Sequence, residues 1–211
     1  AYETLINPIL RDEYDQASRH HRGEKPFDYR SFLREQGDPA SLSKLVFYDL
    51  LHGYEAVAVN QYLQLLQLDG YSLADQFERE DFMDCAYILA EELGQFGETE
   101  HSFRLFFQIA QMELKKPYFR FFFVEVILHL RNLLSATLPA TIPIDRVIIY
   151  LEKTIQLGLP AKDTAFFMKC AAEMYLKRNQ RQRALFYLQE CLRLDSRASG
   201  LKDLRRRLHV G

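Results

Sequence analysis

The sequence is poor in cysteine, and its positive and negative charges nearly balance. Three cysteines, Cys85, Cys170 and Cys191, lie far apart, so they form neither a disulfide framework nor a Cys-x-x-Cys metal pair. We expect reduced, buried thiols, which fit a cytoplasmic protein. Lys and Arg total 27 against 29 Asp and Glu, which gives a net charge of −2. Such a balance provides no overall attraction to nucleic acid or to an anionic membrane.

Long uncharged apolar runs, strand patterns and catalytic signatures are also absent. The longest apolar run, 119–134, contains Arg120, Glu125, His129 and Arg131, too many charges for a membrane span. No β-branched alternation extends over the length of a strand. There is no Gly-rich phosphate loop, no His-Glu-x-x-His and no Gly-x-Ser-x-Gly. We therefore predict a protein that is not an enzyme and that carries no cofactor and no metal.

Helical periodicity, bounded by Gly, Pro and Asp, covers most of the chain. A hydrophobic content of 48% is enough to bury a substantial core. The Pro-containing segment 136–143 is predicted to be a connector between the helices at 118–135 and 145–157. The sequence predicts an all-α fold, with helices at 42–51, 55–68, 81–93, 100–115, 118–135, 145–157, 163–177, 181–194 and 201–208.

A five-residue pattern recurs in three of the predicted helix pairs, at offsets of three, nine, four and three residues. Small residues on both helices allow close approach, and the larger ones fill the groove toward the next pair. Asp49 is unusual, because it is a charged residue at a position that is otherwise large and apolar or aromatic. The third pair, 118–135 with 145–157, matches the pattern only from Val147 to Leu151. The three sets are Val46, Asp49, Ala58, Tyr62, Leu65; Ala90, Leu93, Ser102, Phe106, Ile109; and Ala172, Tyr175, Ala184, Leu188, Cys191.

The segment KCAAEMYLKRNQRQRALFYLQECLRLD (169–195) resembles a tetratricopeptide repeat unit. The units here lie about forty residues apart, whereas regular repeats of this type are about 34 residues long. The resemblance implies a right-handed α-solenoid of about four tetratricopeptide-like helical hairpins over residues 31–211. A short C-terminal helix would cap it, with Leu201, Leu204 and Leu208 facing inward and its basic residues in solvent.

The first fifteen residues, AYETLINPILRDEYD, have a Tyr-containing helix end, an Asn7-Pro8 break and then Arg11-x-x-Tyr14-Asp15. This order resembles the end of a DnaJ-type J domain, so residues 1–15 are interpreted as a remnant of its helices III and IV. The polar stretch 16–30, with the adjacent His20 and His21, is interpreted as a linker. The His-Pro-Asp tripeptide of that family lies upstream in J domains and does not occur in this sequence.

Three further segments, DYRSFLREQGD, KLVFYDLLHG and EDFMDCAYILAEEL, are similar to bacterial J-domain proteins with a helical tail. The resemblance implies the interaction domain of a cytoplasmic bacterial co-chaperone. A missing J domain would recruit a DnaK-type ATPase, while the helical domain binds a client or partner protein, without nucleic acid or membrane. The alternative is a helical scaffold for self-assembly, unrelated to chaperones.

The first helices of the pairs line the inner surface of regular solenoids, so their outward residues are the candidate contacts with a partner. Tetratricopeptide domains that hold the acidic tails of chaperones have Lys and Asn at these places. The carboxylates of Glu91 and Glu173 would repel such a tail, which disfavours that mode of binding. The candidate contact residues are Tyr48, His52, Tyr87, Glu91, Lys169 and Glu173.

An aromatic run, Tyr118 to Phe123, begins the fifth predicted helix. One face of this helix is predicted to be core, and it comprises Phe119, Phe122, Phe123, Val126, Leu130 and Leu133. A second apolar face, Phe121, Val124 and Leu128, is compatible with burial and with an interaction surface. A set of acidic residues near the start of the third predicted helix lacks the oxygen-ligand loop of a calcium site, so it is interpreted as a solvated helix start. The set comprises Glu80, Asp81, Asp84, Glu91 and Glu92.

Overall fold

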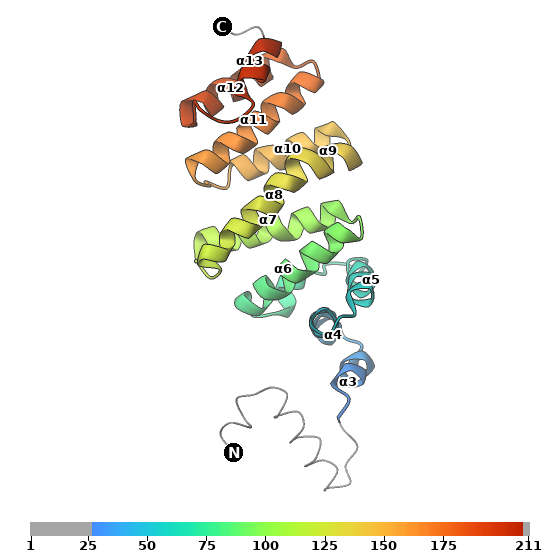
Figure 1. The fold of residues 1–211 in the computed structure, drawn as a ribbon. Coiled ribbons are helices and arrows are strands. Elements are labelled where there is room, and N and C mark those ends of the chain that lie inside the picture. The colour runs from blue at the N-terminus through green and yellow to red at the C-terminus, as the bar shows by residue number, and fades with distance from the viewer. Residues whose placement is uncertain (1–26, 209–211) are drawn as a thin grey trace.

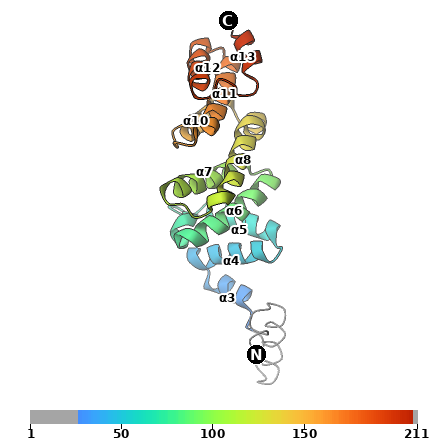
Figure 2. The same ribbon diagram turned by 60° about the vertical axis from the view of Figure 1, so that its left-hand side comes forward.

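A computed structural model describes residues 27–208, which are all-helical and contain no strand. In Figures 1 and 2 the helices follow one another along an elongated molecule, with α3 near one end and α13 at the other. The predicted J-domain remnant, 1–15, and most of the predicted linker lie outside the described residues. The α-helices are α3 (Tyr29–Gln36), α4 (Pro39–Leu51), α5 (Glu55–Leu65), α6 (Arg79–Gln95), α7 (Thr99–Lys115), α8 (Phe123–Asn132), α9 (Leu138–Thr141), α10 (Ile144–Ile155), α11 (Ala161–Lys177), α12 (Arg181–Leu194) and α13 (Leu201–Arg207).

Three helix pairs, α4 with α5, α6 with α7 and α11 with α12, are joined by the same turn. After each first helix one residue has a positive φ: 77° at Gly53, 84° at Gly97 and 58° at Asn179. The next backbone N–H in each turn donates to the carbonyl five residues earlier, at 2.9, 2.8 and 2.9 Å. This is the Schellman geometry, in which a left-handed residue reverses the chain. The accepting carbonyls belong to Asp49, Leu93 and Tyr175, the second positions of the recurring pattern.

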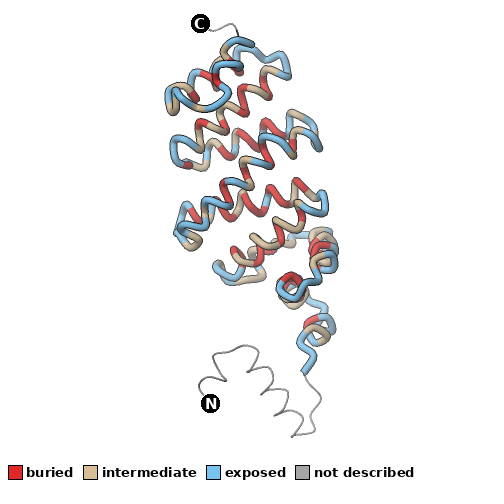
Figure 3. Tube along the Cα trace, in the orientation of Figure 1, coloured by how far each residue is buried: buried red, intermediate tan, exposed pale blue. Residues whose placement is uncertain are grey.

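All three sets of the recurring pattern are buried, and none of their residues is more than 5% exposed. The small residues allow close contact between paired helices: in the α6–α7 pair, the Ser102 hydroxyl donates to the carbonyl of Ala90 at 2.7 Å. The equivalent residues of the last pair, Ala172 and Ala184, are fully buried. Figure 3 shows the buried residues on the helix faces that meet their neighbours. The prediction that these positions are packing positions is therefore confirmed.

The predicted connector 136–143 is wrong, because the chain stays helical as far as Thr141. Between α8 and α9 lies a π-helical turn, η3 (Leu133–Thr137), in which the N–H of Leu138 donates to the carbonyl of Leu133, five residues back. Pro139 follows at once in α9. Proline breaks a regular helix because it lacks an N–H and clashes with the carbonyl four residues earlier. The wider π turn changes the hydrogen-bonding register just before the proline, so the helix continues.

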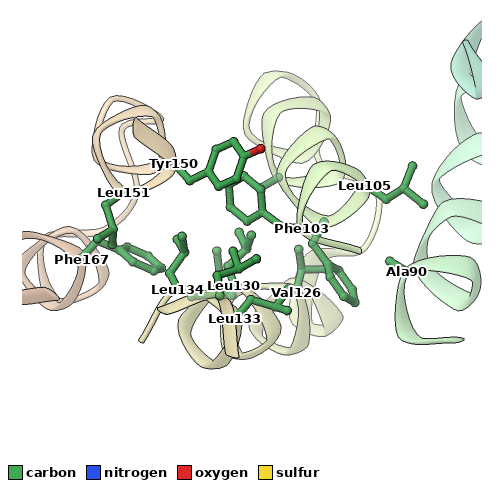
Figure 4. Close-up of a cluster of buried hydrophobic side chains, with 14 of the residues drawn as sticks. Ala90, Phe103, Leu105, Val126, Leu130, Leu133, Leu134, Tyr150, Leu151 and Phe167 are labelled. Carbon is green, nitrogen blue, oxygen red and sulfur yellow. The ribbon is translucent and has the colours of Figure 1, made fainter. Parts of the chain in front are cut away.

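This continuous helix fills the middle of the core. In Figure 4, Val126, Leu130 and Leu134 point toward Phe103 of α7 and toward residues of α10 and α11. By length and composition alone, the segment from Arg120 to Thr141 could also cross a membrane. Of its apolar window, 33% is buried, and the segment packs on α7, α10 and α11.

Helix α3 begins at Tyr29, within the segment predicted to be linker, and the sequence pattern did not identify it. Asp28 caps its start, accepting a hydrogen bond from the N–H of Ser31 at 3.0 Å. Its Arg30 donates to both carboxylate oxygens of Asp49, at 2.7 and 3.1 Å, and this bonding raises the pKa of Arg30. The Arg30 guanidinium also lies 4.4 Å from the centre of the Tyr54 ring. Asp49, the exception in the recurring pattern, thus has a partner outside the pattern.

The three cysteines are buried free thiols, as their spacing predicts. Burial raises the pKa of Cys170 to about 12. The Cys191 thiol donates to the carbonyl of Ala165 at 3.2 Å. These thiols stay protonated at neutral pH and are poor nucleophiles.

The shared turn predicts a residue-specific cost. An alanine side chain at Gly97 would meet no neighbouring atom, so the substitution isolates the strain of the positive φ. We expect Gly97→Ala to lower the free energy of unfolding by about 1–2 kcal/mol, measured by chemical denaturation. Asn179→Gly is the matched control and should change stability little, since both residues accept this conformation. Equal stability of Gly97→Ala and the parent would contradict this account.

The Arg30–Asp49 pair predicts a rescue. Arg30→Met leaves the Asp49 carboxylate buried without its partner, so thermal unfolding should begin at a lower temperature. Adding Asp49→Leu should restore most of the loss, because an apolar pair of similar volume needs no compensating charge. Both variants lack the contact with Tyr54, so their difference reports on Asp49 alone. A double variant as unstable as Arg30→Met would show that the pair is not the cause.

Candidate functional site

An open groove of about 590 Å³ lies between α4, α6 and the segment that leads into α8. Helix α4 contributes two residues one helical turn apart, and α6 contributes three at spacings that share a face. The aromatic run after Lys116-Pro117, which we call the aromatic wall, supplies the rest of the lining. The lining residues are Phe47, Leu51, Asp84, Tyr87, Ile88, Tyr118, Phe119 and Phe122.

A buried carboxylate, that of Glu113 near the end of α7, holds this aromatic wall in place. Glu113 is 4% exposed, and it accepts backbone N–H bonds from Tyr118, Phe119 and Arg120 at 2.8, 2.9 and 2.8 Å. Arg120 has a φ of 51°, a left-handed conformation that is rare for a residue with a side chain. Because unpaired N–H groups collect at a helix start, a carboxylate there is stabilised by both hydrogen bonding and the helix dipole.

Arg79, at the start of α6, binds the C-terminal end of α7, on the other side of the junction between α7 and the aromatic run. Its Nη2 donates to the carbonyl of Met112 at 3.0 Å and to that of Lys116. Helices α6 and α7 and the aromatic wall are therefore linked by hydrogen bonds as well as by packing.

Tyr87 stands at the centre of the groove's aromatic cluster. Its ring centre lies 4.9 Å from that of Phe122, 5.7 Å from that of Phe106 and 6.0 Å from that of Phe119. Its hydroxyl donates to Glu91 at 3.2 Å and lies 3.3 Å from Nε2 of His129. Partial burial and the charge of Glu91 raise the pKa of Tyr87 to about 12, so the hydroxyl remains a donor at neutral pH.

His129 completes this polar group beside the groove. Its ring stacks on Phe106, with the ring centres 4.4 Å apart. Its Nε2 lies 3.2 Å from Oε1 of Glu91, which is an ion pair when the imidazole is protonated. The sequence indicated no partner for this histidine, because Glu91 and Phe106 are distant along the chain.

Carboxylates lie near the two tyrosine hydroxyls of the groove. The hydroxyl of Tyr118 donates to Asp84 at 2.9 Å, and this bond, with the charges of Glu80 and Asp81, raises the pKa of Tyr118. At the other side, the charge of Glu125 contributes to the raised pKa of Tyr87. We call these five residues the acidic rim: Glu80, Asp81, Asp84, Glu91 and Glu125. Glu80 and Asp81 are exposed, whereas Asp84 and Glu91 are half-buried and hydrogen-bonded.

The six candidate contact residues lie in separate places. Tyr87 lines the groove, and Glu91 accepts a hydrogen bond from its hydroxyl. Tyr48 and His52 stack on each other at 3.8 Å, next to Tyr29 of α3. Lys169 and Glu173 are on α11. Among residues 27–208, no hydrogen bond, ion pair or ring contact joins these three pairs.

Lys169 lines a second groove, of about 420 Å³, with Arg131, Lys162 and Phe166. Its Nζ donates to the carbonyl of Ser199 at 3.1 Å. Arg131 stacks over the Phe166 ring and pairs with Asp163 at 2.7 Å. This lining holds three cations and the carboxylate of Asp195, whereas the charged residue in the lining of the first groove is Asp84.

The sequence interpretation missed half of the first groove. Phe47 and Leu51 line it, each one position before the predicted Tyr48 and His52, which is a rotation of about 100° around the helix. Phe122, predicted to be core, is 46% exposed in the groove, whereas Val126, Leu130 and Leu133 are core as predicted. The second apolar face of the fifth predicted helix is exposed, with Phe121, in the turn before α8, 96% exposed, so burial of this face within the described residues is excluded.

Within residues 27–208, no three His, Cys, Asp or Glu side chains are grouped so that they could hold a metal ion. No protein-family model matches the chain, and no curated protein matches it.

The Glu113 junction yields a prediction. Glu113→Leu removes the acceptor of three backbone N–H groups, and we expect it to lower the free energy of unfolding by about 2–4 kcal/mol. Glu113→Gln keeps one acceptor oxygen and should lose less. Chemical denaturation measures both, and a Glu113→Leu protein as stable as the parent would contradict the role of the carboxylate.

Proposed function

We propose that this chain is a protein-binding domain that acts without covalent chemistry and holds a segment of another protein in the groove between α4, α6 and α8. The observation that carries the proposal is the exposure of large apolar side chains in a concave place. Leu51 is 59% exposed and Phe122 46% exposed, both at the groove. Apolar and aromatic side chains that gather in a concave place are the usual lining of a binding site.

We propose further that the helices form a right-handed α-solenoid of about four tetratricopeptide-like hairpins with α13 as a cap. The identical turns after α4, α6 and α11 support this arrangement, as do the buried pattern positions. The chain order of the helices along the molecule in Figure 1 agrees with it. The third hairpin is the irregular one, because η3 lies inside it.

The biological setting that we propose is a bacterial, cytoplasmic J-domain co-chaperone. A J domain upstream would recruit a DnaK-type ATPase, and this domain would hold the client or partner protein. The support is the resemblance of residues 1–15 to the end of a J domain. The upstream coding sequence tests it: an in-frame His-Pro-Asp supports the co-chaperone, and its absence overturns it.

A scaffold for self-assembly is the second candidate, and one observation favours it. The stripe formed by Phe121, in the turn before α8, and by Val124 and Leu128 of α8 is 96%, 59% and 48% exposed, outside the lining of the groove. A second copy could cover this stripe. Light scattering over a range of concentrations tests this candidate, which requires a defined oligomer.

Two neighbouring phenylalanines separate the candidates. We expect the chain to bind a permanently unfolded model protein, and Phe122→Ser to weaken that binding roughly tenfold to hundredfold, the value of burying one aromatic side chain. Phe121→Ser, a change of the same size outside the groove lining, is the control and should leave the affinity unchanged. Fluorescence anisotropy of the labelled unfolded protein measures both affinities.

The reverse result would favour the scaffold. In that case Phe121→Ser would lower the oligomeric mass, and Phe122→Ser would leave the binding unchanged. Absence of any binding to unfolded protein would overturn the client-binding role.

A further inference from the structure

We infer that the occupant of the groove is a basic amphipathic helix of a partner protein, with apolar side chains on one face and Lys or Arg beside them. This inference rests on the proposed binding role of the groove and adds the chemistry of the partner. Three features of the described residues lead to it: the apolar lining, the absence of a sheet edge and the acidic rim.

The lining accepts large apolar side chains. Phe47, Leu51, Ile88, Phe119 and Phe122 are its apolar members. The volume of about 590 Å³ falls within the range of ligand pockets, which is roughly 300–1,000 Å³. A few anchoring side chains from one segment therefore fit, with the rest of the segment along the surface.

The groove offers the backbone of an occupant no ladder of hydrogen-bonding partners, which favours a segment that pairs its own backbone groups. Residues 27–208 contain no strand, so they offer no sheet edge with which an extended segment could pair. The polar groups on the groove walls, such as the hydroxyls of Tyr87 and Tyr118, are already hydrogen-bonded to side chains. A helix pairs its backbone groups internally, and it presents anchors at positions i, i+3, i+4 and i+7.

The acidic rim selects the charge of the occupant. Carboxylates flank both hydroxyls of the groove, with Asp84, Glu80 and Asp81 near Tyr118 and with Glu91 and Glu125 near Tyr87. Long Lys and Arg side chains can cover aromatic surface with their aliphatic parts while their charges reach such a rim. An acidic helix would be repelled by the same residues.

Cations on the same segments do not cancel the preference for a basic occupant. Arg79 is bound to the carbonyls at the end of α7, and His129 contacts Tyr87 and Glu91. Arg120 is exposed at the start of the wall. Lys115 and Lys116 are also exposed on this segment, so the acidic rim acts locally, at the hydroxyls of Tyr87 and Tyr118, and not through an excess of negative charge on all walls of the groove.

Three synthetic helical peptides test the inference. They share one apolar face that includes a tryptophan, and their other positions carry Lys and Arg, Gln, or Glu. This chain contains no Trp, so fluorescence of the peptide reports binding without background from the protein. We expect the basic peptide to bind about tenfold more tightly than the neutral one, equivalent to about 1.4 kcal/mol, and the acidic peptide to bind most weakly. High salt should reduce these differences, because the rim is near solvent.

Matched charge reversals locate the effect. Glu80→Lys combined with Asp81→Lys should remove the preference for the basic peptide, and both sites are exposed, so the fold tolerates the change. Glu190→Lys combined with Asp203→Lys makes the same change of net charge on α12 and α13, where each carboxylate only pairs with a nearby arginine. This control should keep the preference.

The outcomes separate the inference from the proposed function. Equal affinities for the three peptides, or tightest binding of the acidic one, overturn the inference. The binding role then stands if Phe122→Ser still weakens binding of the unfolded protein. If no peptide binds but the unfolded protein does, the helical occupant is wrong. If the basic peptide is preferred but no unfolded protein binds, the inference holds for a folded partner and the client-binding role fails.

Discussion

One buried carboxylate, that of Glu113, connects the second helix pair to everything that follows it. Helical structure is interrupted at Lys116-Pro117, where the end of one helix and the start of the next leave backbone groups without intrahelical partners. Glu113 pairs three of the N–H groups and Arg79 pairs two of the carbonyls, so both ends of the junction are satisfied within a few residues. The aromatic residues that line the groove begin at this junction. Their positions are therefore set by hydrogen bonds of the backbone, and not by aromatic packing alone.

The near-neutral net charge conceals a local separation of charge. The groove of the acidic rim lies among α4, α6 and α8, and the groove of Arg131, Lys162 and Lys169 lies at α11. Because screening limits exposed charges to about 8–10 Å, each groove presents its own charge to a partner, and the distant cations do not cancel it. Composition excludes attraction by the whole molecule, but it does not describe these two surfaces.

The sequence predicted regular helices well and their exceptions poorly. The bounds of α12 agree at both ends, since Gly, Asn and Asp mark helix boundaries in the local sequence. Helix α3 was missed because it is short, has one buried residue, Leu33, and is held by an ion pair to a distant Asp49. Of the candidate contact residues, Tyr87 lines the groove, while the α4 residues that line it, Phe47 and Leu51, each precede a candidate, Tyr48 and His52, by one position. In each case the position of the segment depends on contacts with residues that are distant in sequence. Helical periodicity describes only neighbours along the chain, so it cannot predict such contacts.

The π-helical turn before Pro139 explains why the recurring pattern fades in the third pair. A π turn is one extra residue accommodated inside a helix, and every later side chain is rotated relative to the earlier ones. To align this repeat with the others, a gap would have to be placed in the middle of the helix. Alignments normally place gaps in loops and not inside helices. A protein related by descent through such an insertion would preserve its packing while losing the spacing by which relatives are usually detected.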